Sequence, residues 1–144
     1  MDSSYVERNR VSQERLRALV GQLDDDALRR ELPDGWTVAD ALAHLAFYDR
    51  RAATLLRRFG QEGVFASPYD YDTLNEVLLH FSRRMSPRAI VDEVLAAAEA
   101  ADEAAALTPE ALAADVRSIG QVKLDRSEHR ESHLSDIEAL LGTS

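Results

Sequence analysis

The chain has 144 residues, of which 45% are apolar and 30% charged, and it contains no cysteine. These values are typical of one globular domain spanning residues 1–144. The missing thiols exclude disulfides and zinc–thiolate sites, which leaves histidine and carboxylates as the strong metal ligands. The formal net charge of −9 is unsuited to a nucleic-acid surface, so we expect no nucleic-acid partner.

Helices are predicted along most of the chain, because Ala, Leu, Glu and Arg dominate it and β-branched residues are sparse. A first helix is expected from Ser4 to Leu23, where apolar residues recur at helical spacing. Three consecutive aspartates then cap a short piece that ends at Leu32. The Pro-Asp-Gly sequence that follows is a clear break.

The strongest expected helix opens at Thr37, which together with Asp40 matches a capping box, and it is expected to end at Gly60. Trp36, just before the cap, is interpreted as a core plug at the helix entrance. His44 lies at the edge of the apolar face of this helix. A lone histidine at such an edge is more often structural than a metal ligand.

Residues 61–71 form an expected loop that is longer than most helix connections. Such a loop either lines or covers a site, or simply crosses between helices. Asp72 is expected to cap a third helix, with Val77 and Phe81 facing inward. His80 has no histidine or carboxylate partner at helical spacing and is expected on the surface.

Ser86 is expected to cap the next helix ahead of a proline, and this helix continues through an alanine-rich tract to Leu107. The small side chains of the tract allow a close helix approach, within the chain or across a dimer. A short piece ends near Val116, and the last helix is expected from Val122 to Leu141. Four substantial helices with short extra helical turns and no convincing strand predict an all-α, antiparallel four-helix bundle.

The last helix carries two histidines four residues apart, His129 and His133. Both fall on one face of the helix, within the apolar stripe of Ile137, Leu140 and Leu141. A buried imidazole needs a partner for each ring nitrogen, because an unpaired buried polar group costs roughly 1–3 kcal/mol. A shared divalent metal would be such a partner. For an isolated pair, an ordinary helix surface or a core hydrogen bond is the more frequent explanation.

Three segments in order resemble the DinB-like superfamily, also described as YfiT-like metal-dependent enzymes. They are Gly35-Trp36-Thr37-Val38-Ala39-Asp40-Ala41-Leu42-Ala43-His44-Leu45-Ala46, Asn75 with the Ser86-Pro87 restart, and the closing His129 to Leu134. Thiol-dependent transferases and the N-terminal domain of the mycothiol-dependent maleylpyruvate isomerase are relatives in this superfamily. The resemblance implies a three-histidine site in the bundle that holds nickel or zinc, with His44, His129 and His133 as ligands.

Arg126 and Arg130 project near the histidine pair on the same helical wheel. They are candidate contacts for an anionic substrate or for the carboxylate of a thiol. Alternatively, they pair with acids such as Asp40 or Asp49, and salt bridges at the helix end are slightly the more frequent explanation. A neighbouring cation also weakens metal binding.

The resemblance implies an enzyme in which a divalent metal activates a thiol or water for the transfer, thiol-assisted isomerisation or hydrolysis of a small-molecule substrate. Any thiol is then an external, low-molecular-weight cosubstrate, because the chain has no cysteine. The alternative is a non-catalytic, stress-related bundle with structural or vestigial histidines. We further expect a homodimer, as in relatives, and a cytoplasmic protein without a membrane span, because the chain begins with polar residues and has no long apolar run.

Overall fold

A computed structural model describes residues 4–142 of the chain, and within this range it confirms the all-α bundle. Its seven helices are α1 (Ser4–Val20), α2 (Asp25–Arg29), α3 (Val38–Glu62), α4 (Tyr71–Ser82), α5 (Pro87–Leu107), α6 (Glu110–Ile119) and α7 (Ser127–Leu141). No β-strand occurs among these described residues; there is one isolated bridge, between Glu31 and Thr37. No helix in the same range is long and apolar enough to cross a lipid bilayer.

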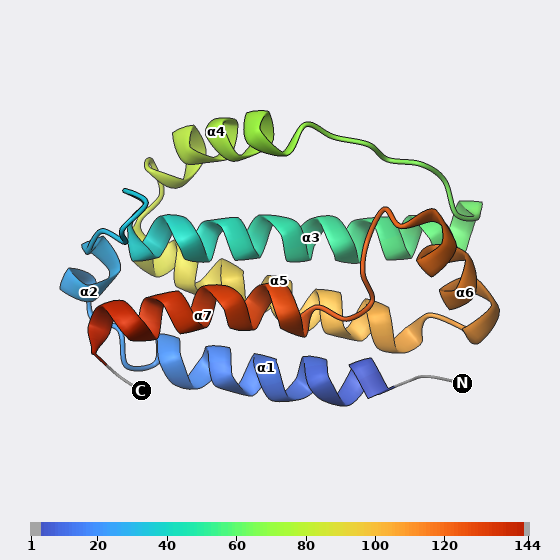
Figure 1. The fold of residues 1–144 in the computed structure, drawn as a ribbon, viewed down its shortest axis with the longest axis horizontal. Helices are drawn as coiled ribbons and strands as arrows, with labels where there is room; N and C mark the ends of the chain where they lie inside the picture. The colour runs from blue at the N-terminus through green and yellow to red at the C-terminus, as the bar shows by residue number, and fades with distance from the viewer. Residues whose placement is uncertain (1–3, 143–144) are drawn as a thin grey trace.

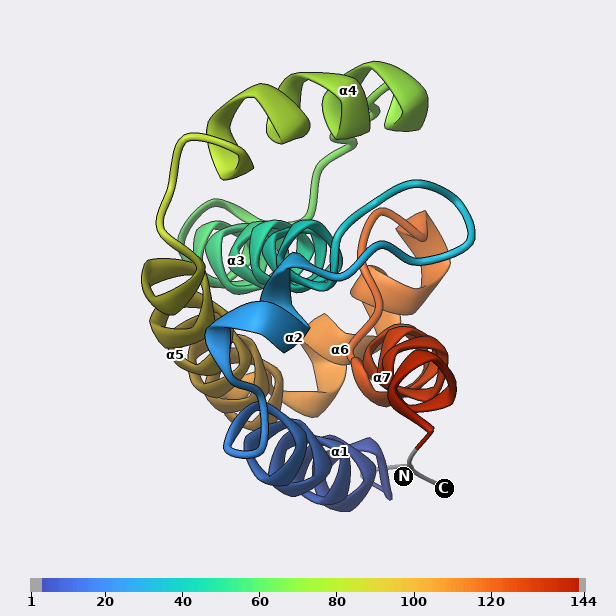
Figure 2. The same ribbon diagram turned by 90° about the vertical axis from the view of Figure 1, so that its left-hand side faces the viewer.

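The four long helices α1, α3, α5 and α7 make the bundle, in the spatial order α1, α5, α3, α7 around its axis (Figures 1 and 2). Neighbours α3 and α5 run in the same direction, and α1 and α7 run in the opposite one. The parallel pair requires a long crossover, which α4 provides by running back along the outside of α3. As a result α7 lies beside α3, although 64 residues or more separate them in sequence.

The core consists of two apolar clusters that follow one another along the bundle. On α3, the first cluster ends at Ala46 and the second begins at Ala52. On α5, the first ends at Ala98 and the second begins at Ala101. Asp49 lies between the two clusters on α3 and is itself buried. A buried polar layer therefore separates two apolar halves of the core, and the candidate site lies beside it.

Helix boundaries agree with expectation where a cap is unambiguous. Thr37 and Asp40 form the predicted capping box, with hydrogen bonds of 3.0 and 3.1 Å between each side chain and the backbone N–H of the other. Ser86 caps α5 as predicted. The predicted stop at Gly60 is wrong: α3 continues to Glu62, and its C-cap is Gly63 with a φ of 85°.

Two further expectations about the later helices are wrong. The cap of α4 is Asp70 rather than Asp72, since its carboxylate accepts the N–H of Thr73. The last helix begins at Ser127, because residues 120–126 form an irregular segment ahead of it. This segment lines the candidate site described below.

Helix α4 packs against the bundle less closely than predicted. Val77 and Phe81 were expected to face inward, yet their side chains are 46% and 67% exposed. Ser82 is the one buried residue of α4 in the described structure. The helix α4 thus crosses over on the outside of the bundle. The helical spacing of its apolar residues did not establish that they face the core. His80 is exposed, as predicted.

Candidate metal centre

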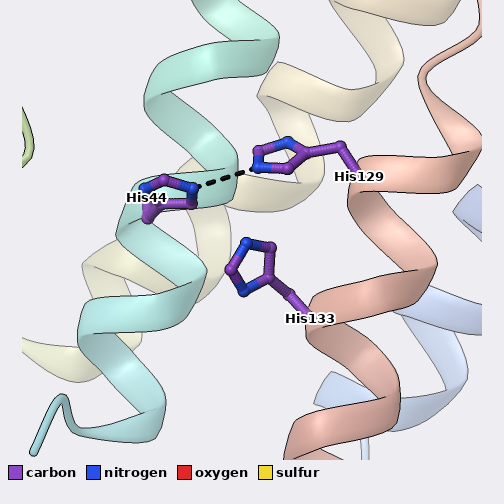
Figure 3. Close-up of side chains that lie close together, drawn as sticks. All are labelled: His44, His129 and His133. Atoms are coloured by element: carbon purple, nitrogen blue, oxygen red, sulfur yellow. Dashed lines mark hydrogen bonds between the residues drawn. The ribbon is translucent and has the colours of Figure 1, made fainter. Parts of the chain in front are cut away.

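Three histidines from two helices converge between α3 and α7 (Figure 3). His44 projects from α3, and His129 and His133 project from successive turns of α7. One ring nitrogen from each lies within 4.8 Å of the others, and the closest pair, His44 Nε2 and His129 Nε2, are 3.0 Å apart. The structure therefore brings together the three residues that the sequence singled out.

Burial favours the neutral form of all three imidazoles. It lowers the pKa of His44 to about 4, with repulsion from His133 adding to the effect. It lowers the pKa of His129 to about 3, again with repulsion from the other two histidines. The pKa of His133 is lowered by burial and partly restored by the carboxylates of Asp136 and Asp34. A neutral imidazole keeps a lone pair free, which is the form that coordinates a metal.

The donor set fits a divalent transition metal. Tetrahedral zinc with Zn–N bonds near 2.0–2.1 Å needs its nitrogens about 3.4 Å apart. One pair of ring nitrogens is 3.0 Å apart and all three lie within 4.8 Å of one another, so small movements of the rings would bring them to that spacing. Three imidazole donors also leave a coordination position for another ligand. His44 Nδ1 is buried without a hydrogen-bond partner. These residues could hold a metal ion, and which metal that is stays a prediction.

The stability of the metal-free protein is expected to fall as the pH decreases from about 6.5 to about 5. In this window the histidines of the unfolded chain take up protons, whereas His44 and His129 stay neutral in the folded state. The unfolded state then binds more protons, so the free energy of unfolding decreases by up to about 1.4 kcal/mol per pH unit for each histidine.

Urea unfolding across this pH range measures that dependence. A His44→Gln, His129→Gln double variant should flatten the profile, and His80→Gln, at an exposed position, should leave it unchanged. A wild-type profile that stays flat or rises as the pH falls would contradict the burial effect.

Aromatic side chains surround the histidines. The Trp36 ring centre lies 5.3 Å from that of His44, and the Tyr48 ring centre lies 4.8 Å from it. The Tyr71 hydroxyl is 3.3 Å from His44 Nε2. Tyr48 donates a hydrogen bond of 3.0 Å to the side-chain oxygen of Asn75, which ties α3 to α4 over the site. These rings cover His44, which is 1% exposed, and a dry environment of this kind strengthens electrostatic interactions.

His129 and His133 each border a different cavity. One, of about 310 Å³, includes His129 in its wall together with Tyr48 and Tyr71. The other, of about 410 Å³, includes His133 together with Trp36. Ligands in these cavities can therefore reach His129 and His133.

Arg126 and Arg130 make buried ion pairs beside the histidines. The nitrogens Arg126 Nε and Arg130 Nη2 each donate to a different oxygen of Asp49, at 2.9 and 3.0 Å. Arg130 also pairs with Asp102 at 3.0 Å, and its side chain is 1% exposed. Of the two acids named from the sequence, Asp49 is thus the partner, and Asp40 bonds to Ser82 instead.

An anion contact by Arg126 and Arg130 stays a prediction, but the two side chains differ in what they offer. Arg126 lines the cavity beside His129. Arg130 lies beneath it, where one terminal nitrogen also donates to Asn9 O and to Ser12 Oγ. Its ion pairs fix α7 against α3 and α5 and so set the direction in which His129 projects.

Sequence reasoning overlooked the tyrosines and Arg51 as parts of the site. His44, Tyr48 and Arg51 lie four and three residues apart on α3, so helical spacing could have placed them on one face. Tyr69 and Tyr71 gave no such signal, because they lie in or next to a loop whose path no periodicity determines.

Comparison with known proteins identifies the family. No curated protein and no solved structure matches the chain. A family model, described as the mycothiol maleylpyruvate isomerase N-terminal domain, matches residues 10–134. The match includes all of α3 and the part of α7 that carries His129 and His133, and this family has a DinB-like fold. The chain therefore belongs to the mycothiol maleylpyruvate isomerase N-terminal domain family.

Proposed function

We propose that this protein is a metal-dependent enzyme in which His44, His129 and His133 hold one divalent ion. The observation that carries the proposal is the convergence of three imidazoles, one buried and two half-buried, from two helices distant in sequence. A bound ion of this kind polarises a water or thiol and favours its deprotonated form at neutral pH. Nickel and zinc both suit three imidazole donors.

Residues of this chain position the metal donors and limit the access of water to them. His44, His129 and His133 supply the donors, and the ion pairs of Arg130 with Asp49 and Asp102 hold α7 in place. The aromatic rings next to His44 keep bulk water away from the reacting groups.

We favour thiol transfer or thiol-assisted isomerisation over hydrolysis. One cavity borders His129 and another borders His133, so there is room beside the proposed ligands for two organic reactants. The name of the family refers to mycothiol, a low-molecular-weight thiol. The chain has no cysteine to serve as an internal nucleophile. An external thiol is therefore the proposed cosubstrate of a small-molecule substrate.

A non-catalytic bundle is the second candidate, and one observation favours it. The closest contact in the cluster, between His44 Nε2 and His129 Nε2, satisfies two ring nitrogens without an ion. In that case the histidines are structural members of the core. A cytoplasmic homodimer is part of either proposal.

Metal analysis followed by a thiol assay separates the two candidates. Protein purified without a histidine tag should carry close to one zinc or nickel ion per chain. The loaded protein should accelerate the conjugation of mycothiol with monochlorobimane, and a chelator should abolish that acceleration until metal is restored. A protein that neither retains nor takes up zinc or nickel at micromolar concentrations would refute the metal proposal. Metal uptake that stabilises the fold, with no turnover of thiol or ester substrates, would favour the structural alternative.

A further inference from the structure

The cavity beside His129 is lined by cationic side chains, although the protein as a whole is acidic. Its wall consists of Tyr48, Arg51, Tyr69, Tyr71, Gly120, Gln121, Val122, Lys123, Arg126 and His129. Three of these are permanent cations, and none is a carboxylate among the residues that the structure describes. The whole chain carries a formal net charge of −9. Such a local concentration of positive charge attracts an anion.

Arg51 is the least neutralised of these cations. Its terminal nitrogens donate to Ser67 O at 2.8 Å and to Gln121 O at 2.9 Å, and its guanidinium carbon lies 4.4 Å from the centre of the Tyr69 ring. It makes no ion pair within residues 4–142, and burial together with the nearby charge of Arg126 lowers its pKa. By contrast, Arg50, the preceding residue on α3, pairs with Glu93.

Arg126 adds a second guanidinium to the same cavity. Its Nε pairs with Asp49, and its terminal nitrogens make no hydrogen bond to any described residue. Asp49 is shared with Arg130, so one carboxylate faces two guanidinium groups. The positive charge at the cavity wall is therefore only partly compensated, even though Arg126 itself is buried. A planar guanidinium with free terminal nitrogens is suited to bind a carboxylate through two hydrogen bonds.

The rest of the wall is aromatic. Tyr48 and Tyr71 are stacked, with ring centres 5.5 Å apart and an angle of 26° between the rings. Tyr69 lies 5.9 Å from Tyr48 and continues the aromatic surface towards Arg51. His129 belongs to the same wall. A ligand that fills this volume therefore meets cationic groups, tyrosine rings and the proposed metal ligand.

We infer that this cavity binds an organic carboxylate with a planar, apolar body, held by Arg51 and Arg126 and directed towards His129. The inference rests on the proposed function, for which it names the chemical class of one reactant. It also distinguishes the two arginines beside the histidines: Arg126 contacts the anion, whereas Arg130 supports the helix. Lys123, which is exposed and lies 3.9 Å from Glu128, attracts the anion to the entrance.

Binding of benzoate to the metal-free protein tests the inference, with benzamide as the uncharged analogue of the same shape. Isothermal titration should show saturable benzoate binding that is at least tenfold tighter than benzamide binding. Arg51→Gln should weaken benzoate binding about tenfold, which corresponds to about 1.4 kcal/mol, and leave benzamide binding unchanged. Arg50→Gln is the matched control, since this neighbouring arginine already has a carboxylate partner, and it should leave both affinities unchanged.

Because Arg51 also holds two loops, a second variant and a competing anion test the inference without changing Arg51. Lys123→Gln, at an exposed side chain, should weaken benzoate binding by a smaller factor. Inorganic phosphate should compete with benzoate if charge alone decides, and it should compete poorly if the tyrosine wall contributes as proposed.

Three results would overturn the inference: equal affinity for benzoate and benzamide, equal effects of the Arg50 and Arg51 variants, or no saturable benzoate binding. Because the protein is metal-free throughout, none of these results depends on whether the histidines bind an ion. Failure of the metal proposal would instead appear in the metal content of the protein.

Discussion

Replacing His129 by alanine is expected to lower the affinity for zinc or nickel by on the order of 100-fold or more, without unfolding the bundle. The substitution removes one of three converging donors and the closest neighbour of His44 Nε2. Loss of an outer-shell partner alone costs about 10–100-fold in metal affinity, so the loss of a ligand costs at least as much. Competition against a chromophoric zinc chelator measures the affinity, and far-UV circular dichroism measures the fold.

His80→Ala is the control for this substitution, because His80 is exposed on α4 and lies outside the three-histidine cluster. It should leave the metal affinity unchanged. His133→Ala should behave like His129→Ala. Equal metal affinity in the His129 and His80 variants, with both proteins folded, would mean that the ion is not held by the cluster.

Replacing Arg130 by methionine is expected to destabilise the protein by about 3–5 kcal/mol. The Arg130 side chain is almost completely buried, and it binds the carboxylates of Asp49 and Asp102. Without it, Asp102 loses its cationic partner and Asp49 keeps only Arg126, so negative charge remains in the interior of the bundle. Urea unfolding followed by circular dichroism measures the difference.

Arg10→Met is the matched control on the surface, since Arg10 pairs with exposed glutamates on its own helix. Pairs of this kind contribute about 0–1 kcal/mol. Adding Asp102→Leu to the Arg130 variant should recover part of the lost stability, because it removes one of the unpaired carboxylates. Equal effects of the Arg10 and Arg130 substitutions would contradict the assigned role of the polar layer.

The sequence was informative wherever local chemistry decides. Thr37 and Asp40 satisfy the first free N–H groups of α3, and this capping box depends on residues three apart. Ser86 ahead of a proline begins α5 for the same reason. The helix period placed His129 and His133 on one face of α7, and both remain partly buried in the structure. The resemblance added His44, which the helix pattern alone left as a structural residue.

Local sequence signals gave wrong predictions for one helix end and for one apolar helix face. A glycine often ends a helix, but Gly60 lies within α3 because the turn that needs a positive φ comes at Gly63. Val77 and Phe81 fit an apolar helix face, yet no helix within residues 4–142 covers them and they stay exposed.

What the sequence by itself determined is the set of helices, their main caps and the three histidines as candidates for one site. Only the tertiary structure decided that α3 and α5 run in parallel, since this depends on the path of the crossover and not on any helix. It likewise decided that Arg130 is buried between Asp49 and Asp102 while Arg51 lines a cavity without a carboxylate. Charges distant in sequence can compensate each other only after the chain has folded, and no spacing along the chain records which of them meet.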